Sequence, residues 1–150
     1  MLNAMPKRYD ATGKSTLPAG LLKAAMLRHA RVLPREFFDR DPVTVGRELL
    51  GKLLIRREGR ALLAGRIVED EAYLGVEDPA AHAYSGRTPR NSVLFGPPGH
   101  AYVYFIYGNH YCLNISCMPE GYAGCVLLRA MEPVFGLPAM ARAQIGRAHV

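Results

Sequence analysis

Residues Ile67–Gly75 read IVEDEAYLG and place three consecutive carboxylates, Glu69, Asp70 and Glu71, inside a segment that otherwise has the pattern of a β-strand. Acidic residues are poor strand formers and repel one another when adjacent. Side chains alternate across a strand, which puts Glu69 and Glu71 on one face together with Tyr73. Asp70 is then predicted on the opposite face. A carboxylate beside a tyrosine indicates a possible site, whereas a carboxylate among apolar neighbours is costly unless it is paired.

The segments around this stretch alternate between strand patterns and turn patterns. Upstream, Asp41-Pro42 is a favourable N-cap and first-turn pair for a short helix through VTVGRELL, which Gly51 closes. The predicted strands read KLLIRRE, ALLAGRIVEDEAYL, AYVYFIYG, YCLNISC and GCVLLRAMEP. Their connections are a turn at Glu58-Gly59, a Gly-, Pro- and Ser-rich loop over 75–98, a hairpin at Gly108-Asn109-His110 and a turn over 119–124.

Composition indicates one soluble globular domain. The chain has 150 residues, of which 49% are hydrophobic, and a net charge of +6. It contains no apolar run of about 18 residues, so a cytoplasmic location without membrane contact is expected, at the nucleoid if the source is bacterial. Three cysteines without CxxC spacing are predicted to be buried thiols rather than disulfides or zinc ligands: Cys112, Cys117 and Cys125.

The chain is expected to divide into three parts. Residues 1–33 are basic and poor in aromatic residues, and are predicted to be a disordered tail or an upstream extension before a true start at Met26. Residues 34–143 have the pattern of a domain. Residues 144–150, QIGRAHV, resemble the peptide encoded by a common sequencing-adapter stretch, so they are interpreted as an artefact; the alternative is an ordinary helix end.

One region combines aromatic residues with an absence of acids. Between Pro79 and Pro119 there is no Asp or Glu, yet this region holds seven of the thirteen Phe and Tyr residues and three of the five histidines. Such a surface suits a polyanion with stackable bases, because stacking on an aromatic side chain contributes about 1–3 kcal/mol per base. The alternative is that these aromatic residues on alternating strands form a core.

Four phrases in order carry a family resemblance: VGRELLGKLL, IVEDEAYLGVEDPAAHAYSGRTPRN, YVYFIYGNHYCLNIS and VLLRAMEP. Over about residues 33–140 the chain resembles the alkyladenine (3-methyladenine) DNA glycosylase family, of the methylpurine glycosylase type. The resemblance implies an α+β fold, a single domain around a curved, mainly antiparallel β-sheet with peripheral helices. Family members continue for several dozen residues further, so by this resemblance the domain is incomplete at its C-terminus.

The resemblance also implies an activity. Enzymes of this family flip an alkylated or deaminated purine out of double-stranded DNA and hydrolyse its N-glycosidic bond. The expected enzyme is monofunctional, works in base excision repair as a monomer, and needs no metal or cofactor. By the same resemblance, Glu71 is the carboxylate that activates water, and Arg129 is a catalytic basic residue that holds the nucleotide's phosphate or the water.

Further residues receive roles from the same resemblance. The base pocket is expected to contain Tyr73, His82, Tyr104 and Asn114. Tyr107 is expected to intercalate where the flipped nucleotide left the duplex. The DNA backbone is expected to contact Arg87, Thr88 and Arg90.

Two other functions remain open from the sequence. One is a metal-dependent hydrolase that uses four carboxylates as oxygen ligands: Asp70, Glu71, Glu77 and Asp78. The other is an inactive fragment that binds lesion DNA but releases no base. Loss of activity in EDTA would indicate the metal-dependent hydrolase. Binding of lesion DNA without release of a base would indicate the inactive fragment.

Overall fold

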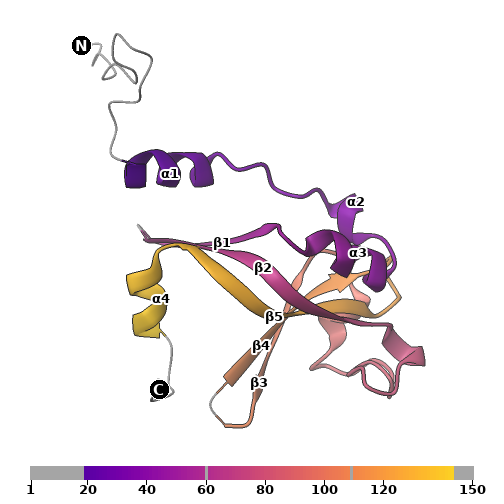
Figure 1. Cartoon of the computed structure of the whole chain (residues 1–150). Coiled ribbons are helices and arrows are strands. Elements are labelled where there is room, and N and C mark those ends of the chain that lie inside the picture. Colours follow the sequence, from indigo (N-terminus) through magenta and orange to yellow (C-terminus); the bar gives the residue numbers. More distant parts are fainter. Residues whose placement is uncertain (1–18, 60, 109, 144–150) are drawn as a thin grey trace. The chain divides into compact units, whose positions relative to one another are not determined.

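The computed structural model describes residues 19–59, 61–108 and 110–143 (Figure 1). The chain divides into two compact units, residues 1–31 and 32–150. In the first unit the structure describes one helix, α1 (Ala19–Arg28). The predicted status of residues 1–33 as a tail stays a prediction. The interpretation of residues 144–150 as an artefact, and Asn109 of the predicted hairpin, lie outside the described residues.

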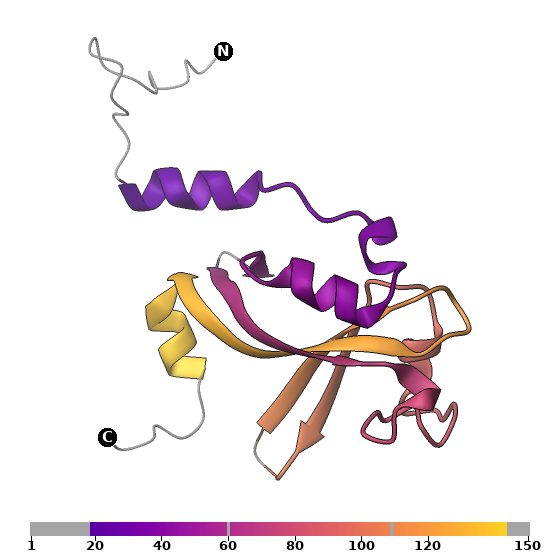
Figure 2. The same cartoon turned by 45° about the vertical axis from the view of Figure 1, so that its right-hand side comes forward.

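The second unit is built on a five-stranded antiparallel sheet, which confirms the predicted α+β class. The strand order is β1-β2-β5-β4-β3, and the sheet coils strongly along its length (Figures 1 and 2). Every predicted strand is present, within a few residues of its expected ends: β1 (Leu53–Glu58), β2 (Ala61–Tyr73), β3 (Ala101–Ile106), β4 (His110–Cys117) and β5 (Gly124–Phe135). Short helices surround the sheet: α2 (Arg35–Phe38), α3 (Pro42–Leu49), α4 (Leu137–Ala143), and the 3₁₀ helices η1 (Gly75–Glu77) and η2 (Ser92–Phe95).

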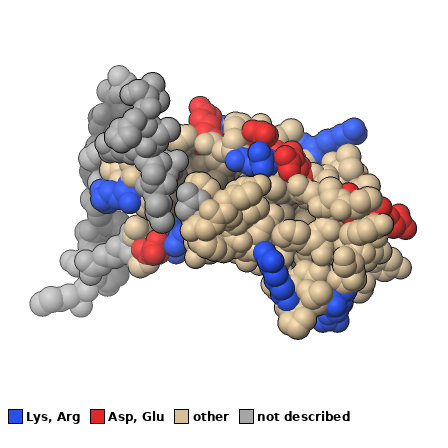
Figure 3. All heavy atoms as spheres, turned by 90° about the horizontal axis from the view of Figure 1, so that it is seen from below, with Lys and Arg blue, Asp and Glu red and all other residues tan. Residues whose placement is uncertain are grey.

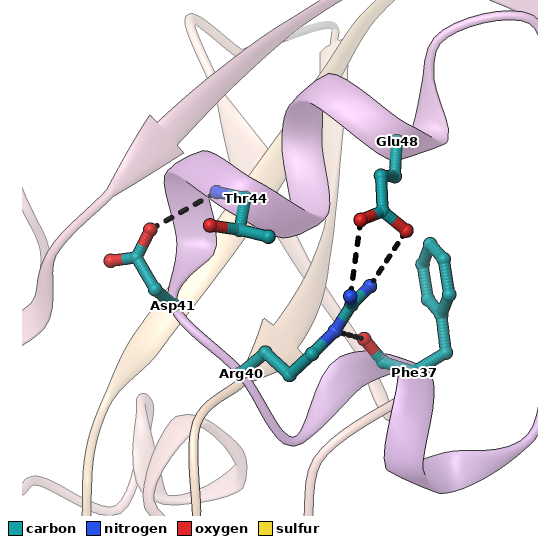
Figure 4. A network of polar contacts seen from close by, with 5 residues as sticks. All are labelled: Phe37, Arg40, Asp41, Thr44 and Glu48. Carbon is teal, nitrogen blue, oxygen red and sulfur yellow. Dashed lines mark hydrogen bonds and ion pairs between the residues drawn. The ribbon is translucent and has the colours of Figure 1, made fainter.

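Helix α3 begins where the sequence predicts. The Asp41 carboxylate accepts a hydrogen bond from the Thr44 backbone N–H at 3.0 Å, and Pro42 occupies the first turn (Figure 4). Beside this cap, the Arg40 guanidinium donates to both carboxylate oxygens of Glu48, at 3.1 and 3.0 Å, and lies over the Phe37 ring. These contacts join α3 to the α2 segment.

Helix α3 covers one face of the sheet. Its buried residues Val45 and Leu49 pack against Ile67 of β2 and against β5 residues Val126 and Leu128. The other face of the sheet forms a second apolar cluster with the 75–98 loop and η2: Ala83, Leu94, Phe95, Tyr102, Ala123 and Cys125. The loop predicted to be irregular is therefore anchored by its own buried side chains.

The prediction of buried thiols holds for two of the three cysteines. Cys117 and Cys125 are buried and Cys112 is half-buried, and none is in a disulfide. Burial raises the pKa of Cys117 and of Cys125 to about 12, so both stay protonated at neutral pH. Within the described residues, no helix is both long enough and apolar enough to cross a membrane.

Register shifts interrupt the pairing of β2 with β5 at three places, and two of these bulges lie beside Glu69. The register shifts between Ile67 and Glu69 and again between Glu69 and Asp70, where Arg129 is the extra residue on β5. As a result Ile67 and Asp70 both face α3, although they are three residues apart. The predicted alternation from Glu69 to Tyr73 is retained. Bulges of this kind re-aim side chains, and they are common next to active sites.

Asp70 points toward α3, on the opposite face of the sheet from Glu71, as its place in the strand predicts. A Cβ atom added to Gly46 of α3 would lie 2.9 Å from the Asp70 Oδ1 atom, so the absence of a side chain at this position makes room for the carboxylate. Among the described residues, Asp70 Oδ2 is a buried side-chain oxygen with no hydrogen-bond partner. Desolvation raises the pKa of Asp70, because burial disfavours the charged form.

We expect Asp70→Asn to increase stability at neutral pH. A raised folded-state pKa contributes stability below the unfolded-state value, and this contribution is lost as the pH rises through the folded-state value. The difference in melting temperature between Asp70→Asn and the parent should therefore grow as the pH rises from 4 to 7. The lower limit is close to the pKa of an aspartate in the unfolded chain, about 3.9. Thermal unfolding at several pH values measures it. A difference that shrinks with rising pH would show that the carboxylate has a stabilising partner.

The sheet forks beyond its centre. Strands β4 and β5 pair over only four residue positions, from Asn114↔Leu127 to Cys117↔Gly124. Past this junction, β5 continues beside β2 while β4 continues beside β3, so the β3–β4 hairpin projects away from α3 (Figure 1). The predicted site residues lie on both sides of this junction: Glu71 and Tyr73 are on β2, and Tyr104 is on β3.

Candidate functional site

The carboxylate of Glu71 is held at both oxygens. Arg129 Nε lies 3.3 Å from Oε1 of Glu71, and the Tyr73 hydroxyl donates to Oε2 at 2.8 Å. The two bulges place Arg129 opposite this part of β2. Because a carboxylate oxygen has two lone pairs, each oxygen can accept one further hydrogen bond from water. The arrangement fixes the carboxylate while leaving it able to accept a proton.

Glu69 lies near Arg129, whereas Tyr73 is hydrogen-bonded to Glu71. Glu69 Oε1 is 3.9 Å from Arg129 Nε and its side chain is more exposed than that of Glu71. Burial, and then the hydrogen bond to Glu71, raise the pKa of Tyr73 to about 12. The Tyr73 hydroxyl therefore stays a neutral donor to Glu71 throughout the physiological range.

A small pocket begins at Tyr73. Its cavity volume is about 30 Å³, which is enough for a water molecule and far less than a purine ring system needs. Four of the lining residues are those predicted from sequence for a base pocket, so the fold brings this set together; the lining is Tyr73, Ala80, His82, Leu94, Tyr102, Tyr104, Asn114 and Cys125.

Aromatic rings form one wall of the pocket. The His82 and Tyr104 ring centroids are 4.4 Å apart, and those of Tyr102 and Tyr104 are 5.3 Å apart. His82 Nδ1 lies 3.0 Å from the Tyr102 hydroxyl. Partial burial, and then the nearby Arg90 charge, lower the pKa of His82. Burial raises the pKa of Tyr104.

Asn114 and Cys125 meet where β4 pairs with β5. The Asn114 side chain is buried, its Nδ2 donates to the Tyr102 carbonyl at 3.4 Å, and the Cys125 thiol donates to its Oδ1 at 3.7 Å. These contacts fix which end of the amide is the donor. Nδ2 keeps one further N–H available.

Asn91 organises the loop that carries His82. Its side chain is buried, accepts from the Thr88 N–H at 2.7 Å, and donates to the carbonyls of His82 and Gly86 at 2.9 and 3.0 Å. The Asn91 N–H in turn donates to the Thr88 hydroxyl oxygen at 3.3 Å. One side chain thus closes the 82–91 segment into a defined loop.

We expect Asn91→Ala to lower the free energy of unfolding by about 2 kcal/mol, because it leaves three backbone groups without their partner. Asn91→Asp is the matched variant: it keeps the acceptor for Thr88 and loses the donor to His82 and Gly86. Chemical denaturation measures both. If Asn91→Ala behaves like the parent, water satisfies these groups and the loop does not depend on Asn91.

The predicted backbone-contacting residues lie on this same loop. Arg87, Thr88 and Arg90 are all exposed. Arg90 also reaches the pocket wall, since its Cζ atom lies 5.7 Å from the centroid of the Tyr104 ring. Seen from below, a broad area of the surface has neutral side chains, and the Lys and Arg side chains at its edge stand apart from one another (Figure 3).

Tyr107 lies at the end of β3, away from the pocket. It is 87% exposed, and its φ of 53° is in the left-handed region that non-glycine residues rarely adopt. An exposed aromatic side chain in a strained backbone conformation is a common mark of a functional position. The neighbouring hairpin strands also expose Val103, Phe105 and Tyr111.

The four carboxylates considered for a metal site are not brought together. Asp70 faces α3 while Glu71 faces Arg129, and the Asp78 carboxylate accepts from the backbone N–H groups of Leu74 and Ala80. In the part of the chain that the structure describes, no group of three or more His, Cys, Asp or Glu residues is placed to hold a metal ion. The geometry does not favour the metal-dependent alternative.

Sequence reasoning missed three residues of the site. Tyr102 alternates with Tyr104 on β3, so the period of two was a signal that could have found it. Cys125 lies opposite Tyr73 in the β2–β5 register, and Asn91 acts through loop carbonyls. Neither arrangement has a sequence signal of its own.

Fold and site together define an α+β protein with an aromatic pocket beside a carboxylate that arginine and tyrosine hold in place. The sequence profile described as Methylpurine-DNA glycosylase (MPG) matches residues 36–149. The chain belongs to this family, which confirms the resemblance seen in the sequence.

Curated relatives agree with this assignment. A "Putative 3-methyladenine DNA glycosylase" of Koribacter versatilis is 71% identical over 109 residues, which cover 73% of this chain and 53% of the relative. Proteins of the same name from Burkholderia lata and Clostridium acetobutylicum are 57% and 53% identical, and cover 75% and 72% of this chain and 53% of each relative. The chain spans about half the length of the curated relatives it matches.

Proposed function

We propose that this chain acts as a DNA repair glycosylase that flips an alkylated or deaminated purine out of duplex DNA and hydrolyses its N-glycosidic bond. The observation that carries the proposal is the Glu71 carboxylate, held by Arg129 and Tyr73 at the edge of the aromatic pocket. Its family membership supports the same reaction class.

Glu71 acts on water. The carboxylate accepts a proton from a water molecule that attacks C1′ of the nucleotide, and its negative charge stabilises the oxocarbenium-like transition state. An alkylated purine such as 3-methyladenine is cationic and leaves readily, so one carboxylate suffices where most sugar hydrolases use two. Arg129 orients Glu71 through the 3.3 Å contact between its Nε atom and the carboxylate.

The pocket selects the base. Tyr73 stacks on one side of the flipped purine, and His82 and Tyr104 stack on the other, where electron-rich rings attract a cationic base. Asn114 crowds a guanine 2-amino group in this proposal, and its contacts with Cys125 and Tyr102, which fix the amide, support that role.

Contacts outside the pocket hold the duplex open. Tyr107 enters the space that the flipped nucleotide leaves, which offsets part of the unstacking cost of a few kcal/mol. Arg87, Thr88 and Arg90 contact backbone phosphates and fix the position of the duplex without reading its sequence. The enzyme works as a monomer and is monofunctional, because the motif contains no lysine nucleophile.

The test is base release from a duplex oligonucleotide with a single hypoxanthine or ethenoadenine, in EDTA and under single-turnover conditions. We expect release of the lesion base and none from an undamaged duplex, with strand breaks only after alkali. Loss of activity in EDTA would favour the metal-dependent hydrolase. Binding without release by the folded chain would identify an inactive lesion-binding fragment.

A further inference from the structure

The aromatic wall of the pocket already has a cation over it. Arg90 Cζ lies 5.7 Å from the Tyr104 ring centroid, within the range at which a guanidinium is attracted to an aromatic face. Tyr104 lines the pocket, and Arg90 is exposed on the adjoining loop.

The Arg90 charge reaches two further residues of the same wall. It lowers the pKa of His82, second to burial, and it opposes the rise that burial produces in the pKa of Tyr102. Three of the rings at the pocket therefore experience the field of one guanidinium. A cationic purine entering the pocket meets this like charge.

The small size of the pocket is also compatible with movement of side chains at its edge, such as Arg90, when a base binds. The cavity of about 30 Å³ is smaller than a purine, so a bound base displaces side chains at the edge of the pocket or extends through its open mouth. Asn91 anchors the backbone beside Arg90, whereas the long Arg90 side chain is exposed and has several rotatable bonds. The side chain can therefore leave Tyr104 while the loop keeps its conformation.

We propose that Arg90 is a specificity-determining residue that competes with the cationic base for the aromatic wall and is drawn from Tyr104 to a phosphate when duplex DNA binds. This inference deepens the proposed function and rests on it for the identity of the ligand. It gives Arg90 two positions with opposite effects. In the free protein it weakens binding of a cationic purine, and on DNA it strengthens binding of the duplex.

Two small probes test the first effect without any catalysis. The 3,9-dimethyladeninium ion carries a permanent charge, and 9-methyladenine has the same ring system without charge. Calorimetry on the parent chain and on Arg90→Ala should give about threefold to tenfold tighter binding of the cation in the variant. Affinity for the neutral probe should change by less than about twofold, because no cation–cation repulsion is relieved.

Duplex DNA tests the second effect. Arg90→Ala should bind a lesion duplex more weakly. The magnitude of the slope of log K against log salt concentration should fall by about 1, which corresponds to the loss of one phosphate contact. Arg87→Ala is the matched comparison, since it removes the same charge from the same loop: it should weaken duplex binding and leave the affinity for the purinium ion unchanged.

The outcomes separate this inference from the proposed glycosylase activity. Unchanged or weaker purinium binding by Arg90→Ala overturns the inference even if the parent releases bases. An equal shift for both probes, or no binding of either probe, also overturns it. Tighter purinium binding supports it even if this chain releases no base, and circular dichroism of each variant establishes that the fold is retained.

Discussion

Glu71→Gln is expected to lower the rate of base release at least about 100-fold, because a positioned general base typically contributes 10²–10⁴ to a rate. The amide keeps the size of the carboxylate and can still accept from Tyr73, but it cannot take a proton from water. It also removes the charge that faces Arg129 at 3.3 Å. Single-turnover release of hypoxanthine from a duplex, compared with the parent chain, measures the effect.

Glu69→Gln is the matched control for this variant. Glu69 is the same residue type on the same strand, and it lies 3.9 Å from the same guanidinium, but it has no contact with Tyr73 among the described residues. We expect its rate of base release to fall by less than about tenfold, the effect of a weakened electrostatic contact. Equal losses in the two variants would mean that water activation does not belong to Glu71.

Gly75→Ala is expected to lower the free energy of unfolding by about 3 kcal/mol. Gly75 has a φ of +85°, and an added Cβ would lie 3.1 Å and 3.2 Å from the backbone carbonyl carbon and oxygen of Ala123. The left-handed conformation costs a non-glycine residue about 1–2 kcal/mol, and the close backbone contact adds an overpacking cost of about 1–3 kcal/mol. Urea unfolding followed by circular dichroism measures the change.

Gly86→Ala separates the two contributions. Gly86 has a nearly identical φ of +86°, but an added Cβ would meet no atom within 4 Å. Its substitution should therefore cost only the conformational part, about 1 kcal/mol. If Gly75→Ala costs no more than Gly86→Ala, the start of β5 can move to accept a methyl group, and the junction beside the pocket is softer than the structure indicates.

Local sequence patterns predicted the elements well, because each element has a short-range cause. The Asp41-Pro42 pair sets the start of α3 through a cap that involves the next three residues. The strands followed from alternation and turn residues. The bulges in β2 and β5 could not be predicted in this way, because they depend on how two distant strands align.

The site was predicted in part. The resemblance placed Tyr73, His82, Tyr104 and Asn114 together, and the structure brings them to one pocket. Tyr102 could have been found from its alternation with Tyr104 on β3, whereas Cys125 joins the pocket through the pairing of β5 with β2, which is a long-range relation. Arg90 was assigned to the DNA backbone alone, and its position over Tyr104 is visible only in three dimensions.

The fork in the sheet makes the β3–β4 hairpin a lever. Its fulcrum is the four-position junction at which Asn114 and Cys125 meet, and Tyr107 stands at its outer end. From Tyr102 to Tyr107 the arm is about 17 Å long, at about 3.4 Å per residue. A swing of about 10° at the fulcrum thus moves the tip by about 3 Å. A force on Tyr107 at the outer end of the hairpin would therefore reach the hydrogen bonds that hold Asn114 at the pocket.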